Sequence, residues 1–170
     1  ITQLDYSNKN LTELPELPNS LKILYCEYNK LTKLPKLPEL LEILDCDINK
    51  LTKIPELPNT LKNLYCKNNY LTQLPQLPNN LEFLYCDNNE ITQLPKLPNN
   101  LEYLYCDNNE ITQLPKLPNT LEILSCKNNK LPYDNLEEYK EYIKKHKDII
   151  DKYGYDEAMN ILSDTNKYNL

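Results

Sequence analysis

The sequence predicts a solenoid, a fold in which short parallel strands and extended segments coil around a line of buried leucines. The first observation is a 20-residue repeat, because residues 81–100 return almost unchanged as residues 101–120. The second is the spacing of the six cysteines, each of which follows the previous one by 20 residues. Self-similarity at such a period is typical of solenoids, in which each unit packs only on its neighbours.

The repeating unit reads L-x-x-L-x-C-x-x-N-x-[LI]-T-x-[LI]-P-x-L-P-x-x and begins at residues 21, 41, 61, 81 and 101. A degenerate copy begins at residue 1, with Tyr6 in the place of the cysteine and Lys9 in the place of the asparagine, and a truncated copy begins at residue 121. We therefore expect about seven coils over residues 1–132. Ordering one such unit costs more free energy than its own burial returns, so the coils are stable only as an array.

Each coil is predicted to contain one short strand and no helix. Side chains alternate around the fourth position of the unit, so that Leu84 and Cys86 face inward while Phe83 and Tyr85 face outward. We expect this strand to pair in parallel with those of the neighbouring coils. The Leu-Pro-x-Leu-Pro segment that follows cannot be helical, because proline fixes φ and biases the preceding residue away from the α region. An extended or polyproline-II convex side is expected there.

Residues 133–170 have a different pattern and are predicted to form a C-terminal helical cap and tail. A stripe at helical spacing predicts one helix, and its members are Leu136, Tyr139, Ile143, His146, Ile150 and Tyr153. Asp134 or Asn135 can cap its start, and Gly154, the only glycine, can end it in the left-handed conformation. A second short helix is expected over residues 156–162. The apolar stripe should cover the last coil at Leu121, Leu124 and Cys126.

Charge and composition exclude several classes of function. The chain carries a formal charge of −6 and lacks arginine, whereas binding to a nucleic-acid backbone requires clustered basic side chains. No apolar run reaches the roughly 20 residues of a membrane span. A soluble protein without nucleic-acid or membrane partners is therefore expected.

The cysteine and asparagine ladders are predicted to be structural. Cysteines on neighbouring parallel strands have the wrong geometry for disulfides. The sequence also lacks the ligands of a zinc site, because it has no C-x-x-C pair and only one histidine, His146. Buried, inert thiols are the remaining interpretation, and they favour a cytoplasmic location. The asparagines at the bend after each strand can bond backbone groups of their own and adjacent coils. No nucleophile, base and orienting group occur together, so we expect no enzyme, no cofactor and no metal.

The residues Leu-x-x-Leu-x-Cys-x-x-Asn-x-Leu resemble the consensus of leucine-rich repeat proteins, over residues 1 to about 131. The short Leu-Pro-x-Leu-Pro unit looks like the LPX subclass found in secreted effectors of bacterial pathogens, and its style is similar to repeat proteins of amoebae and giant DNA viruses. The resemblance implies a protein-binding horseshoe, in host cytoplasm if the source is a pathogen or virus. Some bacterial relatives carry a cysteine-dependent ubiquitin ligase domain. That activity is not implied here, because no cysteine follows Cys126.

The outward side chains of the strands, on the expected concave face, are the candidate binding site. Five aromatic residues fall on three neighbouring strands, with acidic residues around them. The candidate residues are Tyr25, Tyr65, Phe83, Tyr85, Tyr103, Tyr105, Asp87 and Asp107. Stacking that only stabilises the sheet is one interpretation, and a binding patch is the other, which we favour.

The matching partner is a polypeptide with basic residues and apolar or aromatic anchors. Aromatic rings make strong contacts with such anchors and stack on cations, while an acidic rim attracts and orients a basic partner. A glycan stacked on the tyrosines is a second possibility. We expect a monomeric interaction module. The alternative is a structural or self-assembling repeat protein that associates end to end through its first coil or pairs through its aromatic face.

Overall fold

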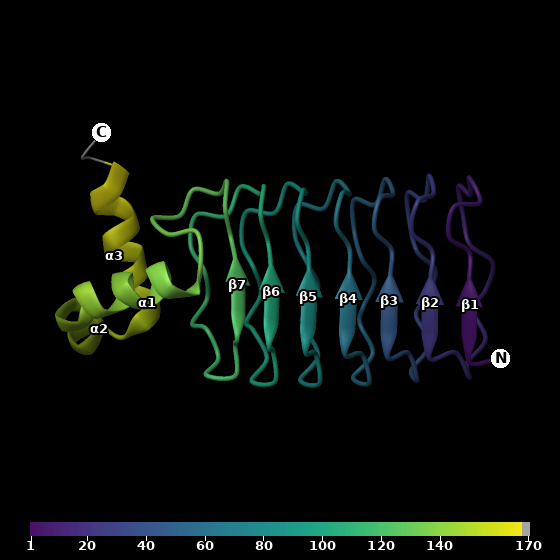
Figure 1. The fold of residues 1–170 in the computed structure, drawn as a ribbon, viewed down its shortest axis with the longest axis horizontal. Coiled ribbons are helices and arrows are strands. Elements are labelled where there is room, and N and C mark those ends of the chain that lie inside the picture. Colours follow the sequence, from purple (N-terminus) through teal and green to yellow (C-terminus); the bar gives the residue numbers. More distant parts are fainter. Residues whose placement is uncertain (168–170) are drawn as a thin grey trace.

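In the computed structural model, which describes residues 1–167, seven three-residue strands form one parallel sheet in chain order (Figure 1). The strands are β1 (Gln3–Asp5), β2 (Ile23–Tyr25), β3 (Ile43–Asp45), β4 (Asn63–Tyr65), β5 (Phe83–Tyr85), β6 (Tyr103–Tyr105) and β7 (Ile123–Ser125). Every strand pairs in register with its neighbour, as in Leu64 opposite Leu84. The predicted solenoid, with one strand from each repeat, is confirmed.

The core is a column of leucines and cysteines inside the coils. Leu64, Leu84 and Leu104, at the centre of their strands, are 0% exposed, whereas the residues on either side of each point outward and are partly exposed. All six cysteines are free and buried. Burial raises the pKa of the Cys66 thiol well above its ordinary value. The prediction of buried thiols without disulfides is confirmed.

The asparagine at the ninth position of each unit joins adjacent coils. Asn69 is representative: its Nδ2 donates to the carbonyl of Cys46 in the preceding coil (3.1 Å) and to those of Cys66 and Lys67 in its own. Its Oδ1 accepts the N–H of Leu51, again in the preceding coil, at 3.0 Å. This confirms the predicted structural role, since the amide satisfies backbone groups that the bend leaves unpaired.

The first coil lacks this asparagine and is the most loosely packed. Lys9 stands in its place, and the N–H groups of Lys9 and Leu11 both bond to Oδ1 of Asn29 in the second coil. Leu4 and Tyr6 are only partly buried, while their counterparts in the central coils are fully buried.

The Leu-Pro segments run without regular secondary structure along the side of each coil opposite the strand, and among the described residues no helix begins before Leu136. Each turn back into the next strand is closed by a bond to a proline carbonyl, as from the N–H of Leu81 to Pro78 at 3.1 Å. The prediction of a convex side without helices is confirmed.

The predicted single helix over 136–153 is wrong, because the structure has two: α1 (Leu136–Lys145) and α2 (Lys147–Tyr153). His146 breaks the helix with φ −107° and ψ 19°, while its ring packs on Tyr142 and its Nδ1 lies 2.8 Å from the Tyr142 carbonyl oxygen. The turn lets Ile150 pack on α3 (Tyr155–Lys167), which is longer than the predicted second helix. Gly154 ends α2 with φ +78°, but its ψ of 165° lies outside the left-handed helical region that was expected.

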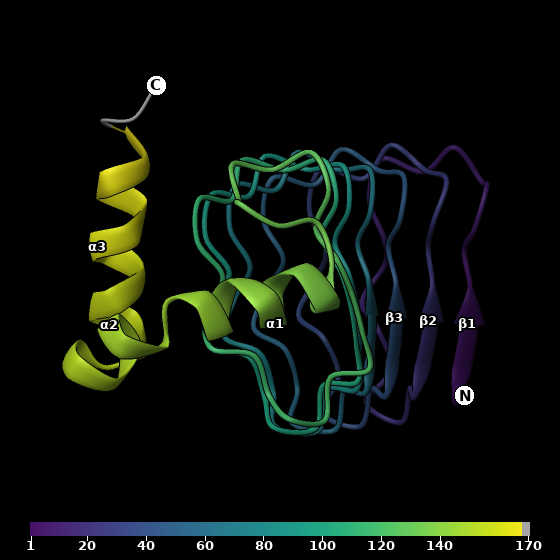
Figure 2. The ribbon, with the colours of Figure 1, turned by 60° about the vertical axis from the view of Figure 1, so that its left-hand side comes forward.

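The cap covers the last coil with α1 and the segment that leads into it (Figure 2). The N–H of Cys126 bonds to the Asp134 carbonyl at 2.9 Å, which closes the seventh coil. Tyr133 and Tyr139 are buried, with their rings edge to face at 5.2 Å. Leu121 and Leu124 are buried, as expected. The cap differs from expectation in its second half.

Asn135 is the residue that caps α1, since its side chain accepts the N–H of Glu138 at 3.0 Å. The half of the predicted stripe that follows His146 does not reach the coils. Ile150 packs within the cluster of Ala158 and Met159, and Tyr153 is 41% exposed.

A row of left-handed residues follows the strands at the eighth position of the unit. Five of the seven are asparagines with φ of 54° or 55°, but Tyr28 (φ 56°) and Ile48 (φ 52°) occupy the same place in the second and third coils. Asparagine tolerates this conformation, whereas it strains a β-branched side chain by about 1–2 kcal/mol.

We therefore expect Ile48→Asn to raise the free energy of unfolding by about 1 kcal/mol, because asparagine relieves that strain. Urea unfolding followed by circular dichroism measures the change. The matched control is Asn68→Ile one coil further on, which should lose a similar amount. A protein made less stable by Ile48→Asn would contradict the account of this row.

Candidate functional site

Two rows of stacked rings cover the outward side of β4, β5 and β6, which we call the strand face. One row runs through Tyr65, Tyr85 and Tyr105, with ring centroids 5.0 Å and then 4.7 Å apart. The second pairs Phe83 with Tyr103 at 4.9 Å and an interplanar angle of 12°. All five side chains are partly exposed. The in-register sheet spaces its strands by ~4.8 Å, which matches the stacking distance of the rings.

The structure brings five of the six predicted aromatic residues together and leaves Tyr25 apart. Tyr25 lies on β2, in the same row of the sheet, but the residue opposite it on β3 is Asp45 and the next ring, Tyr65, is one strand further. The stack is therefore interrupted at Asp45.

Glutamates flank the ring rows on the amino-terminal side of the strands. Glu82, Glu102 and Glu122 stand in neighbouring coils, and no ion pair is formed by any of them within residues 1–167. The Tyr103 hydroxyl donates to Oε2 of Glu122 at 3.3 Å, and the charge of that carboxylate raises the pKa of Tyr103. This edge of the strand face is acidic beside β5 and β6, whereas Lys62 stands at the same place before β4.

Asp87 and Asp107, predicted as rim residues of the site, hold backbone groups of the next coil. Oδ1 of Asp87 accepts the N–H of Asp107 at 3.0 Å, and Oδ1 of Asp107 accepts the N–H of Lys127 at 2.7 Å. Asp87 is 8% exposed, and burial raises its pKa. Their involvement in binding stays a prediction, but both carboxylates have a structural task that the sequence analysis missed.

A lysine and three carboxylates lie beside the interruption in the ring row. Lys67 Nζ is 3.4 Å from Oδ2 of Asp47 and lies over the Tyr85 ring, 5.6 Å from its centroid. Asp45 accepts the N–H of Asp47 at 3.1 Å and has no ion pair among the residues described. Oε2 of Glu27 is buried and has no hydrogen-bond partner there.

The carboxyl of Asp45 is costly to ionise in the folded chain. Burial is the main cause that raises its pKa, to about 6, and the neighbouring Asp47 and Glu27 carboxylates add to the effect. The sequence analysis passed over Asp45, although its place between two tyrosines in the repeat could have marked it.

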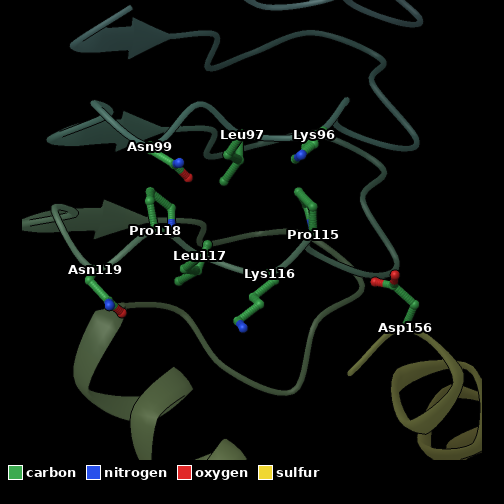
Figure 3. Close-up of a pocket in the computed structure, with 9 residues that line it drawn as sticks. All are labelled: Lys96, Leu97, Asn99, Pro115, Lys116, Leu117, Pro118, Asn119 and Asp156. Carbon is green, nitrogen blue, oxygen red and sulfur yellow. The ribbon is translucent and has the colours of Figure 1, made fainter. Parts of the chain in front are cut away.

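The side of the coils opposite the strands carries a shallow pocket of about 590 Å³ between the fifth and sixth Leu-Pro segments and α3 (Figure 3). Its lining is mainly Leu-Pro backbone and side chains, with one lysine from each of the two coils, Lys96 and Lys116, and Asp156 from α3 at the edge. Smaller hollows recur at the same place between other coils, so the feature is a consequence of the repeat.

Neither a metal centre nor a membrane span is found in the part of the chain that the structure describes. No three potential ligands among histidine, cysteine, aspartate and glutamate gather as a metal site there. None of the helices in residues 1–167 has the length and apolar character needed to cross a bilayer.

Comparisons with known proteins agree with this geometry. The family described as leucine-rich repeats (2 copies) matches residues 79–119. No curated protein matches the sequence significantly. Among solved structures, the chain is similar to YopM from Yersinia enterocolitica WA-314, with 41% identity over 72% of this chain and a TM-score of 0.71. The chain therefore has a leucine-rich repeat fold.

Its repeats are similar to those of bacterial effectors. A Shigella effector leucine-rich repeat domain has 29% identity and a TM-score of 0.69, over 87% of this chain and 76% of that one. YopM from Yersinia pestis, a leucine-rich effector protein, has 36% identity and a TM-score of 0.64, over 77% of this chain and 45% of that one. The chain spans only 27% of the length of the Y. enterocolitica protein.

Replacing Asp45 by asparagine tests the electrostatics of the interrupted row. Because the folded pKa lies above the ordinary value, the folded protein binds more protons than the unfolded chain between about pH 4 and 6, so stability falls as the pH rises through that window. Asp45→Asn keeps the acceptor oxygen and removes the charge. We expect it to raise the free energy of unfolding at pH 7.5 by about 1 kcal/mol, after allowance for solvent screening of this partly exposed group.

Urea unfolding at pH 7.5 and pH 4 measures this effect, and the gain should shrink at the lower pH. Asp5→Asn is the matched control, because Asp5 occupies the same row in the first coil but has its pKa lowered by bonds from Ser7. That variant should gain no stability. An Asp45→Asn protein no more stable than the original at pH 7.5 would show that the carboxyl is compensated.

Proposed function

We propose that the chain is a non-catalytic protein-interaction module that binds a basic polypeptide on the strand face. The observation that carries the proposal is the pair of stacked ring rows on β4, β5 and β6, partly open to solvent and bordered by glutamates that form no ion pair within residues 1–167. Contiguous exposed aromatic side chains are typical of protein interfaces, where tyrosine and tryptophan often dominate the binding free energy.

The charge of the surface selects the partner. Glu82, Glu102 and Glu122 give the amino-terminal edge of the strand face three like charges in neighbouring coils, and the chain as a whole carries −6. Lysine or arginine residues of a partner can pair with that edge and stack on the rings. The position of Lys67 over Tyr85, beside the Asp47 carboxylate, is an internal example of a cation held in this way.

The leucine-rich repeat fold and the effector repeats that it resembles support an interaction module rather than an enzyme. Six buried, free thiols favour a reducing compartment, so we place the protein in cytoplasm, which is a host's cytoplasm if the source is a pathogen or virus.

Selection of peptides from a random display library tests the proposal with a defined ligand. The immobilised protein should enrich peptides that combine lysine or arginine with apolar or aromatic residues. Tyr85→Ala and Tyr105→Ala should each weaken their binding by about 2 kcal/mol or more, because each removes a ring from the tyrosine row. Isothermal calorimetry with the enriched peptides measures the change.

Tyr70→Ala is the matched control, since Tyr70 is 53% exposed but lies outside the strand face. It should leave the affinity unchanged. If the double variant Tyr85→Ala/Tyr105→Ala keeps its circular dichroism spectrum and its affinity for the peptides, the rings only stabilise the sheet and the proposed binding site is wrong.

Self-assembly is the second candidate function, and the strand face favours it. Its five stacked rings are partly exposed, and the strand face of a second copy can pack on them. Light scattering over a hundredfold range of concentration should give a constant monomer mass if the chain is an interaction module. A mass that grows with concentration would instead favour assembly.

A further inference from the structure

We propose that the interruption of the tyrosine row at Asp45 is a slot for an arginine side chain of the partner, whose guanidinium stacks between Tyr25 and Tyr65 and pairs with the Asp45 carboxylate. The inference rests on the proposed function, because it assigns one residue of the basic polypeptide to one place on the strand face.

The geometry of the row defines the slot. Tyr25, Asp45 and Tyr65 are register partners on three consecutive strands, and all three point away from the buried leucines. Further along the same row, rings in successive coils stack at 5.0 and 4.7 Å. Two strand spacings separate Tyr25 from Tyr65, roughly 10 Å, and a carboxylate stands where the intervening ring would be. The missing ring leaves room for one planar group.

The chemistry of the slot matches arginine. A guanidinium is planar, stacks on aromatic faces and presents a fork of N–H donors to a carboxylate. The ammonium group of lysine is not planar, so it stacks less well and cannot form the same paired bonds to a carboxylate. One oxygen of Asp45 already accepts the Asp47 N–H, which fixes the side chain, and its other oxygen makes no bond to a described residue. Ile43, two residues earlier on β3, faces the same side and is partly exposed, so the methylenes of an arginine have an apolar surface to cover.

The charges around the slot are unbalanced in the free chain. Glu27, Asp45 and Asp47 are close enough to influence one another, and Lys67, the cation that acts on this group, pairs with Asp47 and lies over the Tyr85 ring, so that three carboxylates share one lysine. The Glu27 carboxylate, one oxygen of which is buried without a hydrogen-bond partner among the described residues, adds to the negative charge beside the slot. A tyrosine at position 45 would extend the stack, but the chain holds a carboxylate there instead. A cation supplied by the partner offsets that electrostatic penalty.

Short acetylated, amidated Gly-Arg-Gly peptides test the slot, with Gly-Lys-Gly and Gly-citrulline-Gly as comparisons. Titration is followed by the ring resonances of the tyrosines in two-dimensional NMR. The arginine peptide should shift the ring resonances of Tyr25 and Tyr65 in a saturable manner. The lysine and citrulline peptides should bind at least about fivefold more weakly, because an ammonium lacks the planar fork of donors and the ureido group of citrulline lacks the charge. Equal affinity for all three peptides overturns the proposal.

Two variants separate the slot from the rest of the surface. Asp45→Asn should weaken the arginine peptide about tenfold, because the charge-assisted bonds are lost while the shape is kept. Asp45→Tyr should fill the slot and abolish the saturable shifts. Glu90→Gln, outside the ring row, is the charge-matched control and should change nothing. Shifts that persist at Tyr25 and Tyr65 in Asp45→Tyr overturn the proposal.

The outcome is distinguishable from that of the proposed function. If library peptides bind and depend on Tyr85 and Tyr105 but are unaffected by Asp45→Tyr, the interaction module stands and the arginine slot is wrong. If the library yields no binders and the arginine peptide still saturates at Tyr25 and Tyr65, the slot stands and the wider binding surface is wrong.

Discussion

The bonds of the ninth-position asparagine hold the solenoid at a fixed period. Each of these amides connects carbonyl groups of its own bend to a carbonyl and an N–H of the preceding coil, as Asn49 does with Cys26 and Leu31. Because the bend is buried, water cannot satisfy those groups. The asparagine therefore sets how one coil lies on the next, and the register of the strands follows from it.

The fixed period leaves the outward strand positions free to vary. Inward leucines, cysteines and asparagines meet the same neighbours in every coil and are nearly invariant, but side chains at the third and fifth positions of the unit contact mainly the adjacent coils and solvent. Those positions change from Ile43 and Asp45 to Phe83 and Tyr85 within two coils. Rings and charges on this face are set in rows by the backbone, so a binding surface can be changed there without changing the fold.

Most of the fold follows from the sequence because a solenoid has mainly local rules. The strands, the extended Leu-Pro side, the buried thiols and the structural asparagines were all predictable from the spacing within one unit. The cap was predictable only in part. The helical stripe continues past His146 in the sequence, yet the helix breaks there because the His146 ring packs on Tyr142 and α3 offers Ile150 a separate apolar cluster.

The candidate site was predictable as a set of rings but not as an arrangement. Spacing places the aromatic residues on one face, whereas the bonds of Asp87 and Asp107 to backbone N–H groups of the next coil depend on side-chain conformations that no period specifies. The isolation of Tyr25 has a different cause. Asp45 replaces the tyrosine that would join Tyr25 to the other rings, and the effect of that replacement depends on the pairing of neighbouring strands in the sheet.

The central claim is that asparagines hold the coils while the rings of the strand face are available for a partner. Comparing the free energies of unfolding of Asn89→Ala and Tyr85→Ala/Tyr105→Ala tests it most directly. Asn89→Ala leaves the buried N–H of Leu71 without a partner and removes one of the donors to the carbonyls of Cys66 and Cys86, so we expect a loss of about 3 kcal/mol or more, whereas the ring variant should lose no more than about 2 kcal/mol. Equal losses, or a larger loss from the rings, would contradict the account, since the aromatic rows would then be part of what holds the fold.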